Sequence, residues 1–276
     1  MGAPQQNKRP TRRPHSALPG VVLAMLLAVG WPQPPLSAKA DERLDAVEAK
    51  YNIPIVTSDV QPVVERIHAS PCTGWELRRY AGLFAEEFSL YPPAVIRRAG
   101  IARVVICRDL ALGEQRRAAI PHFGGSTLFL DAVRGIHIPI YLRRVLHHEL
   151  FHMIDYRDDG DLYSDKEWEA LNPKWFHYGH GGVSAQNDPM SSVLTDRYPG
   201  FLNSYSKTGV EEDKAEVFSN LMVEPAYVAR RCQTDPVLRA KAAAIRRLLK
   251  RFCPDVDERF WVRVAAFRAL PGMTLP

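Results

Sequence analysis

The stretch that most constrains the fold is residues 146–155, LHHELFHMID, because it places three histidines and a glutamate within an apolar segment. Its apolar residues recur at helical spacing, and residues four apart lie on one face of a helix. Four residues after His147 stands Phe151, which cannot bind a metal, whereas four residues after His148 stands His152. The stretch is therefore predicted to be a buried helix that carries an H-E-x-x-H motif.

This motif predicts a zinc site. Two imidazoles on one helix face can hold one Zn²⁺, and Glu149 lies beside them, where it can accept a proton from an activated water. Burying these polar side chains without a ligand would be costly. We therefore expect His148 and His152 as zinc ligands and Glu149 as the general base. Asp155 lies on the same face, where it either accepts the second ring N–H of a ligand histidine or ends the helix.

A catalytic zinc needs a third protein ligand and an open position. The candidates are His177, His180 and the carboxylates of the segment EEDKAEVF, residues 211–218. Thr208 and Glu211 form a capping-box pattern, which predicts a helix start there. Glu212 and Glu216 then share one face, so that Glu212 can bind the metal while Glu216 accepts a histidine N–H. We favour this interpretation over a solvated acidic helix start.

The rest of the pattern predicts an α+β domain. Helices are expected over residues 42–51, 74–90, 140–155 and 211–223 and in the C-terminal part, and strands over 102–107 and 126–130. Pro139 suits the start of the motif helix. The expected architecture is mostly helical, with a small mixed sheet before the motif helix, and residues 41–276 are expected to form a single domain.

Residues 1–40 have the features of a signal peptide. Basic residues precede a short apolar run, residues 20–30, and Ala38-Lys39-Ala40 resembles a cleavage site; an uncleaved anchor is the alternative. The formal net charge of +5 resides in this segment, which contains five bases and no acids, so residues 41–276 carry 31 of each. We therefore expect export to the periplasm or medium, membrane contact only through the targeting segment, and no nucleic-acid partner.

The four cysteines of the chain are an even number, which favours two disulfides in an exported protein. The preferred pairing joins Cys72 to Cys107 and Cys232 to Cys253. A simple buried thiol at Cys107 is the alternative, because that residue ends the apolar run ARVVIC.

Residues 145–220 resemble the glutamate-type zincins, the metallopeptidases that include the anthrax lethal factor catalytic domain and the bacterial Pro-Pro endopeptidases. In that group Asp follows the H-E-x-x-H after two residues, and a Tyr stands seven residues before the ligand Glu of a block E-x-x-A-E-x-F. This chain has HELFHMID and later SYSKTGVEEDKAEVF. The matching positions are His148, Glu149, His152, Asp155, Tyr205, Glu212, Ala215, Glu216 and Phe218. The chain is also similar to uncharacterised bacterial zinc-binding metallopeptidases.

The resemblance implies a zincin-like fold and specific roles for these residues. His148, His152 and Glu212 would bind zinc, Glu149 would act as base, and Tyr205 would stabilise the oxyanion. Asp155 and Glu216 would support the ligands from behind. Phe151 departs from the pattern, because those relatives often have glycine there.

Two further segments bear on substrate binding. The segment LNPKWFHYGHGG and its flank carry Trp168, Trp175, Phe176 and Tyr178, which either shape the cleft or cap a small separate core. The strand at residues 126–130 is expected to be an edge strand to which an extended peptide could be added.

The leading hypothesis is an exported zinc endopeptidase that acts on peptide or protein substrates. Two alternatives stay open: a non-catalytic, zinc-stabilised protein that binds peptides or cell wall, and a zinc hydrolase of peptidoglycan cross-links. Glu149 and Tyr205 favour an enzyme, because a purely structural zinc needs neither.

Overall fold

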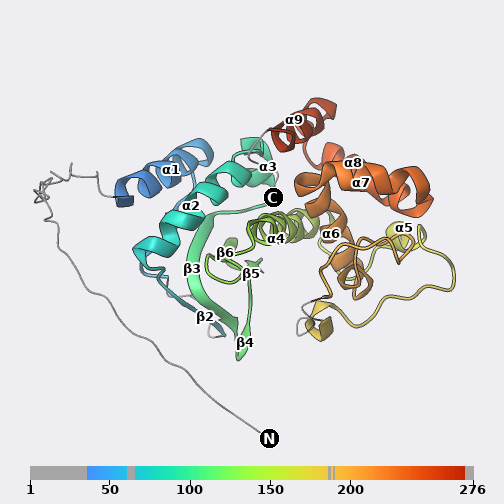
Figure 1. The fold of residues 1–276 in the computed structure, drawn as a ribbon, viewed down its shortest axis with the longest axis horizontal. Helices are drawn as coiled ribbons and strands as arrows, with labels where there is room; N and C mark the ends of the chain where they lie inside the picture. Colours follow the sequence, from blue (N-terminus) through green and yellow to red (C-terminus); the bar gives the residue numbers. More distant parts are fainter. Residues whose placement is uncertain (1–35, 61–65, 186–187, 189, 271–276) are drawn as a thin grey trace, which may run out of the picture. The chain divides into compact units, whose positions relative to one another are not determined.

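Helices surround a small mixed sheet, as the sequence predicts (Figure 1). The computed structural model describes residues 36–60, 66–185, 188 and 190–270. Of the predicted leader, residues 1–40, residues 1–35 lie outside the described residues, and residues 36–40 belong to the first helix. The helices are α1 Leu36–Tyr51, α2 Gly74–Phe88, α3 Pro93–Arg98, α4 Pro139–Asp159, α5 Lys166–Glu169, α6 Val210–Val223, α7 Pro225–Thr234, α8 Pro236–Phe252 and α9 Glu258–Arg268. None of these described helices is long and apolar enough to cross a membrane.

The sheet is built around one long strand, β3 Arg103–Leu112. The other strands are β1 Ile55–Val56, β2 Ile67–Ser70, β4 Gln115–Arg116, β5 Ala119–His122 and β6 Thr127–Asp131. Strands β1 and β6 run parallel to β3, whereas β2 and β4 pair antiparallel with it. Strand β5 is antiparallel to β6 and ends the order β1-β3-β6-β5.

The prediction that residues 126–130 form an edge strand is wrong. Strand β6 lies between β3 and β5, and all five of its residues are buried. Such a continuous apolar strand is typical of an inner position with both faces covered. The terminal strand is β5, and its Pro121, which has no backbone N–H to donate, is suited to an edge.

The motif helix α4 lies between the sheet and the C-terminal helices (Figure 1). Pro139 is its first residue, as predicted, and Gly160 ends it in the left-handed conformation with a φ of 84°. Its apolar side chains belong to the main hydrophobic core. Phe151 is fully buried and packs against Phe218 of α6 with ring centroids 5.0 Å apart, so the bulky residue fits beneath the helix.

Helix α6 begins differently from the prediction. Its N-cap is Gly209, and no side chain caps it; Thr208 instead donates its hydroxyl to the Tyr205 carbonyl at 2.7 Å. Thr208 therefore closes the preceding short 3-10 turn, η2 Tyr205–Lys207, and the predicted capping box is absent.

The two predicted disulfides are also absent, because all four cysteines are free. Cys107 is buried in β3 and donates its thiol to the Leu130 carbonyl. Burial raises the pKa of Cys72 to about 12, and it also raises the pKa of Cys107. A thiol that stays protonated is a poor nucleophile for disulfide formation.

Candidate metal site

Helices α4 and α6 pack together and bring three predicted ligands to one point. His148 Nε2 lies 3.1 Å from His152 Nε2 and 2.9 Å from Glu212 Oε2, and His152 Nε2 lies 3.6 Å from the same oxygen. The three side chains are 8, 9 and 12% exposed. One imidazole pair at i, i+4 on α4 thus meets one carboxylate from the first turn of α6.

This donor set fits a zinc ion. Bonds of about 2.05 Å in a tetrahedron place neighbouring ligand atoms about 3.3 Å apart. The three observed separations, 2.9, 3.1 and 3.6 Å, bracket that value. Two imidazole nitrogens and one carboxylate oxygen form the ligand set of many catalytic zinc sites, which keep the fourth position for water or substrate.

Glu216 lies one turn after Glu212 and holds the first histidine. His148 Nδ1 is 3.0 Å from Glu216 Oε1, so the ring can donate there while its Nε2 faces the other ligands. Glu216 Oε2 accepts from Asn203 Nδ2 at 2.7 Å, which fixes the carboxylate in turn. Asn203 was not predicted, because a single asparagine in an irregular segment has no recognisable pattern.

The electrostatics of the site favour a cation. Burial works against the charged form of His148, but hydrogen bonds to Glu212 and Glu216 outweigh it and raise the pKa of His148 well above its usual value. Burial would likewise raise the pKa of Glu212, yet the contacts with His148 and His152 lower it. Two buried carboxylates therefore attract positive charge to this point, which protons supply when zinc is absent.

Glu149 and Tyr205 complete the set of predicted catalytic residues. Glu149 follows His148 on α4 and is half-buried, and burial raises its pKa. Tyr205, in η2, donates its hydroxyl to Glu212 Oε1 at 2.9 Å. This is not the carboxylate oxygen that lies near the two histidines, which is Oε2. Burial, followed by the charge of Glu212, raises the pKa of Tyr205, which keeps the hydroxyl protonated as a donor.

Asp155 pairs with a lysine rather than with the ring N–H of a ligand histidine. Lys214 Nζ lies 2.6 Å from Asp155 Oδ1 and 3.0 Å from Asp165 Oδ2, and the lysine side chain is only 1% exposed. His152 Nδ1 is buried, and no described residue accepts its hydrogen bond. Asp155 therefore links α4 to α6 through Lys214, a buried lysine that sequence patterns did not single out.

The other candidate ligands lie elsewhere. His177 and His180 are exposed and are not among the described residues that converge on a metal position. The nearby aromatic residues do not form a separate core among the described residues. Trp168 is buried in the main hydrophobic core and Tyr178 packs against that core, whereas Phe176 packs on Phe201 with ring centroids 4.5 Å apart and Trp175 is 77% exposed.

The third histidine of the motif helix belongs to a second cluster. His147 Nε2 lies 2.7 Å from Glu87 Oε2, and its Nδ1 contacts the Tyr91 hydroxyl. Glu87 of α2 is also paired with Arg143 of α4 and Arg268 of α9. Burial, followed by these two arginines, lowers the pKa of His147, so this imidazole is neutral.

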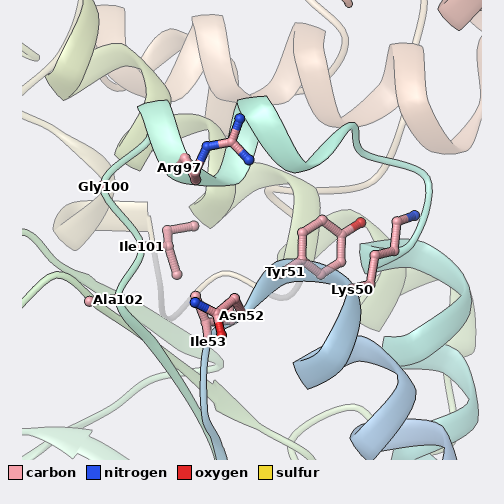
Figure 2. A pocket seen from close by; sticks show the side chains of 8 residues that line it. All are labelled: Lys50, Tyr51, Asn52, Ile53, Arg97, Gly100, Ile101 and Ala102. Carbon is pink, nitrogen blue, oxygen red and sulfur yellow. The ribbon is translucent and has the colours of Figure 1, made fainter.

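A surface pocket lies between the end of α1 and the turn after α3. It is lined by Lys50, Tyr51, Asn52, Ile53, Arg97, Gly100, Ile101 and Ala102, as Figure 2 shows. None of these residues belongs to the metal site.

Comparison with known proteins supports the fold. A crystal structure from Bacteroides caccae, named there a "putative zinc-binding metallo-peptidase", is similar to this chain with a TM-score of 0.52 and 17% sequence identity. The similarity covers 84% of this chain and 91% of that chain. No family model matches the sequence, and no curated protein matches it either. The chain therefore has a metallopeptidase-like fold.

Proposed function

We propose that the protein is an exported zinc endopeptidase of the glutamate-type zincins. One observation carries the proposal: His148 and His152 of α4 and Glu212 of α6 present three donor atoms at the spacing of a zinc ligand set. Glu149 lies beside these donors, and Tyr205 contacts the Glu212 carboxylate. The residues 1–40 leader supports export, to the periplasm or the medium.

A bound zinc ion would activate a water molecule and polarise the scissile carbonyl. Glu149 would take the proton from that water and deliver it to the leaving amine. Its raised pKa suits this exchange, because a base works best when its pKa approaches the operating pH. Tyr205 would turn from Glu212 Oε1 to donate to the developing oxyanion, a contribution of roughly 2.7–4 kcal/mol in other enzymes.

The test is a paired measurement on wild type and Glu149→Gln. Zinc content is determined by metal analysis, and cleavage is followed on a peptide library that includes cross-linked peptidoglycan fragments. We expect Glu149→Gln to retain zinc and to lose about 10²- to 10⁴-fold in cleavage rate. Glu167→Gln, which changes an exposed glutamate of α5, serves as the control and is expected to behave as wild type.

The alternatives give different results. Fully zinc-loaded wild type that cleaves nothing in the panel would support a non-catalytic zinc-stabilised binding protein. Cleavage confined to the peptidoglycan fragments would support a hydrolase of cell-wall cross-links. Wild type that binds no zinc would contradict all three readings.

A further inference from the structure

A glycine-rich segment, Tyr-Gly-His-Gly-Gly at residues 178–182, lies against the start of α6; we call it the strap. The Tyr178 hydroxyl donates to Asp213 Oδ2 at 2.6 Å. The Gly179 and Gly181 N–H groups donate to the carbonyls of Lys207 and Thr208 at 3.0 and 2.6 Å. Three hydrogen bonds thus attach the strap to η2 and the first turns of α6, which carry Tyr205 and Glu212.

The anchor of the strap is deeply buried. Asp213 and Lys241 of α8 form an ion pair at 2.7 Å, and both side chains are fully buried. Asp213 Oδ2 also accepts from Trp168 Nε1 at 2.9 Å. A buried, paired charge with several donors holds one geometry, because breaking any contact would expose an uncompensated group. The position of the strap is therefore fixed at Tyr178.

Gly182, at the other end of the strap, touches the metal site. A Cβ atom there would overlap the Tyr205 hydroxyl and Glu212 Oε1, closer than real carbon contacts allow. The backbone of Gly182 is outside the left-handed region, so space rather than conformation requires glycine. The strap backbone therefore packs directly on the outer oxygen of the predicted ligand carboxylate.

The two oxygens of Glu212 consequently have different surroundings. Oε2 faces His148 and His152 at 2.9 and 3.6 Å, whereas Oε1 is held by the Tyr205 hydroxyl at 2.9 Å and covered by Gly182. A carboxylate free to turn could bind a metal through both oxygens and fill a second coordination position.

We propose that Gly182 is a positioning residue that, together with Tyr205, limits Glu212 to one-oxygen ligation and so keeps a coordination position open. The inference rests on the zinc site of the proposed function, but not on peptidase activity. It concerns the geometry of the metal, which can be measured without a substrate.

The test compares Gly182→Ala and Tyr205→Phe with wild type. Zinc affinity is measured by competition with a chromogenic chelator. Coordination number is read from the visible absorption of the Co²⁺-substituted protein, whose bands are strong for four ligands and weaken as ligands are added. The control is Gly124→Ala in the turn before β6, where an added Cβ would lie 3.8 Å from the nearest atom, an ordinary contact.

Gly182→Ala is expected to raise the zinc dissociation constant about 10- to 100-fold, the range seen when residues behind a ligand are altered. Tyr205→Phe is expected to retain zinc but to weaken the cobalt bands, because Oε1 loses its hydroxyl partner and can turn to the metal. Circular dichroism of the metal-free variants checks the fold. Gly124→Ala is expected to match wild type in every measurement.

Wild-type zinc affinity and an unchanged cobalt spectrum in Gly182→Ala would overturn the proposal. If Gly182→Ala does not fold, Tyr205→Phe becomes the test. A wild-type cobalt spectrum in Tyr205→Phe would then contradict the proposal. These outcomes are separate from the fate of the proposed function. Wild type that binds four-coordinate cobalt but cleaves no peptide would end the peptidase proposal and leave this one standing.

Discussion

Helix α4 carries two histidine–carboxylate clusters that use the same residue types for different ends. The metal cluster comprises His148, His152, Glu212 and Glu216, and the Glu87 cluster comprises His147, Glu87, Arg143 and Arg268. In the Glu87 cluster two guanidinium groups pair with one buried carboxylate, and the imidazole is neutral. In the metal cluster the two carboxylates contact imidazole, hydroxyl and amide groups, and the pKa of His148 is raised.

The difference lies in the cations that accompany the carboxylates. A buried carboxylate needs a positive partner, and the Glu87 cluster obtains its partners from the chain itself. The metal cluster has no such Lys or Arg among its described contacts, so a divalent ion can supply the missing charge. Buried histidine and glutamate side chains therefore indicate a metal site only when no Lys or Arg of the chain pairs with the carboxylates.

The strongest test of this contrast is to break the Glu87 cluster. Glu87→Gln removes the buried carboxylate that pairs with Arg143 and Arg268 and leaves only the exposed Glu86, 3.3 Å from Arg143, so the free energy of unfolding is expected to fall by about 3–5 kcal/mol. Urea unfolding monitored by circular dichroism measures it, with metal-free wild type as reference. The folded fraction is expected to bind zinc as wild type does; loss of zinc binding together with unchanged stability would reverse the assignment of the two clusters.

Zinc removal acts on the metal cluster alone. With free zinc at 100 times its dissociation constant, binding stabilises the folded state by about 2.7 kcal/mol. Chelation is expected to lower the thermal unfolding midpoint of wild type, as measured by calorimetry. His148→Ala, which lacks one ligand, is the comparison and is expected to show little response to the chelator. Equal shifts in both proteins would place the ion elsewhere.

Glu216→Gln sharpens the contrast within the metal cluster. The amide oxygen can still accept from His148 Nδ1, but the amide nitrogen cannot accept from Asn203 Nδ2, and the negative charge is lost. We expect the zinc dissociation constant to rise about 10- to 100-fold with a small effect on folding. Isothermal titration with zinc measures the change. An unaltered affinity would show that Glu216 acts only through packing.

The smallest effect is expected at the surface. Arg251 pairs with Asp158 near the end of α4 at 3.1 Å, and the arginine side chain is 68% exposed. Solvent screens such pairs, so Arg251→Ala is expected to change the free energy of unfolding by about 0–1 kcal/mol. The same urea titration checks it. A loss as large as that of Glu87→Gln would mean that burial does not separate the two kinds of ion pair.

Local sequence patterns predicted some residues of the metal site and missed others. The H-E-x-x-H register was predictable, because helical spacing is a local property. The approach of Glu212 depends on how α6 packs against α4, and the capping box that was expected to start α6 is absent. The partner of Asp155 was not predictable, because Lys214 looks like an ordinary charged residue of an acidic helix until α6 turns it inward. Asn203 and Gly182 gave no local signal either, although the first contacts Glu216 and the second covers Glu212.

The amino-acid sequence alone determined the α+β class, the main helices and the face of α4 that carries two imidazoles, since these follow from short-range periodicity. Tertiary structure decided which acid meets which base, the inner position of β6, the separation of the four free thiols, and the place of the strap. Those features depend on contacts between residues far apart in the chain, whose burial and charge balance no local pattern encodes.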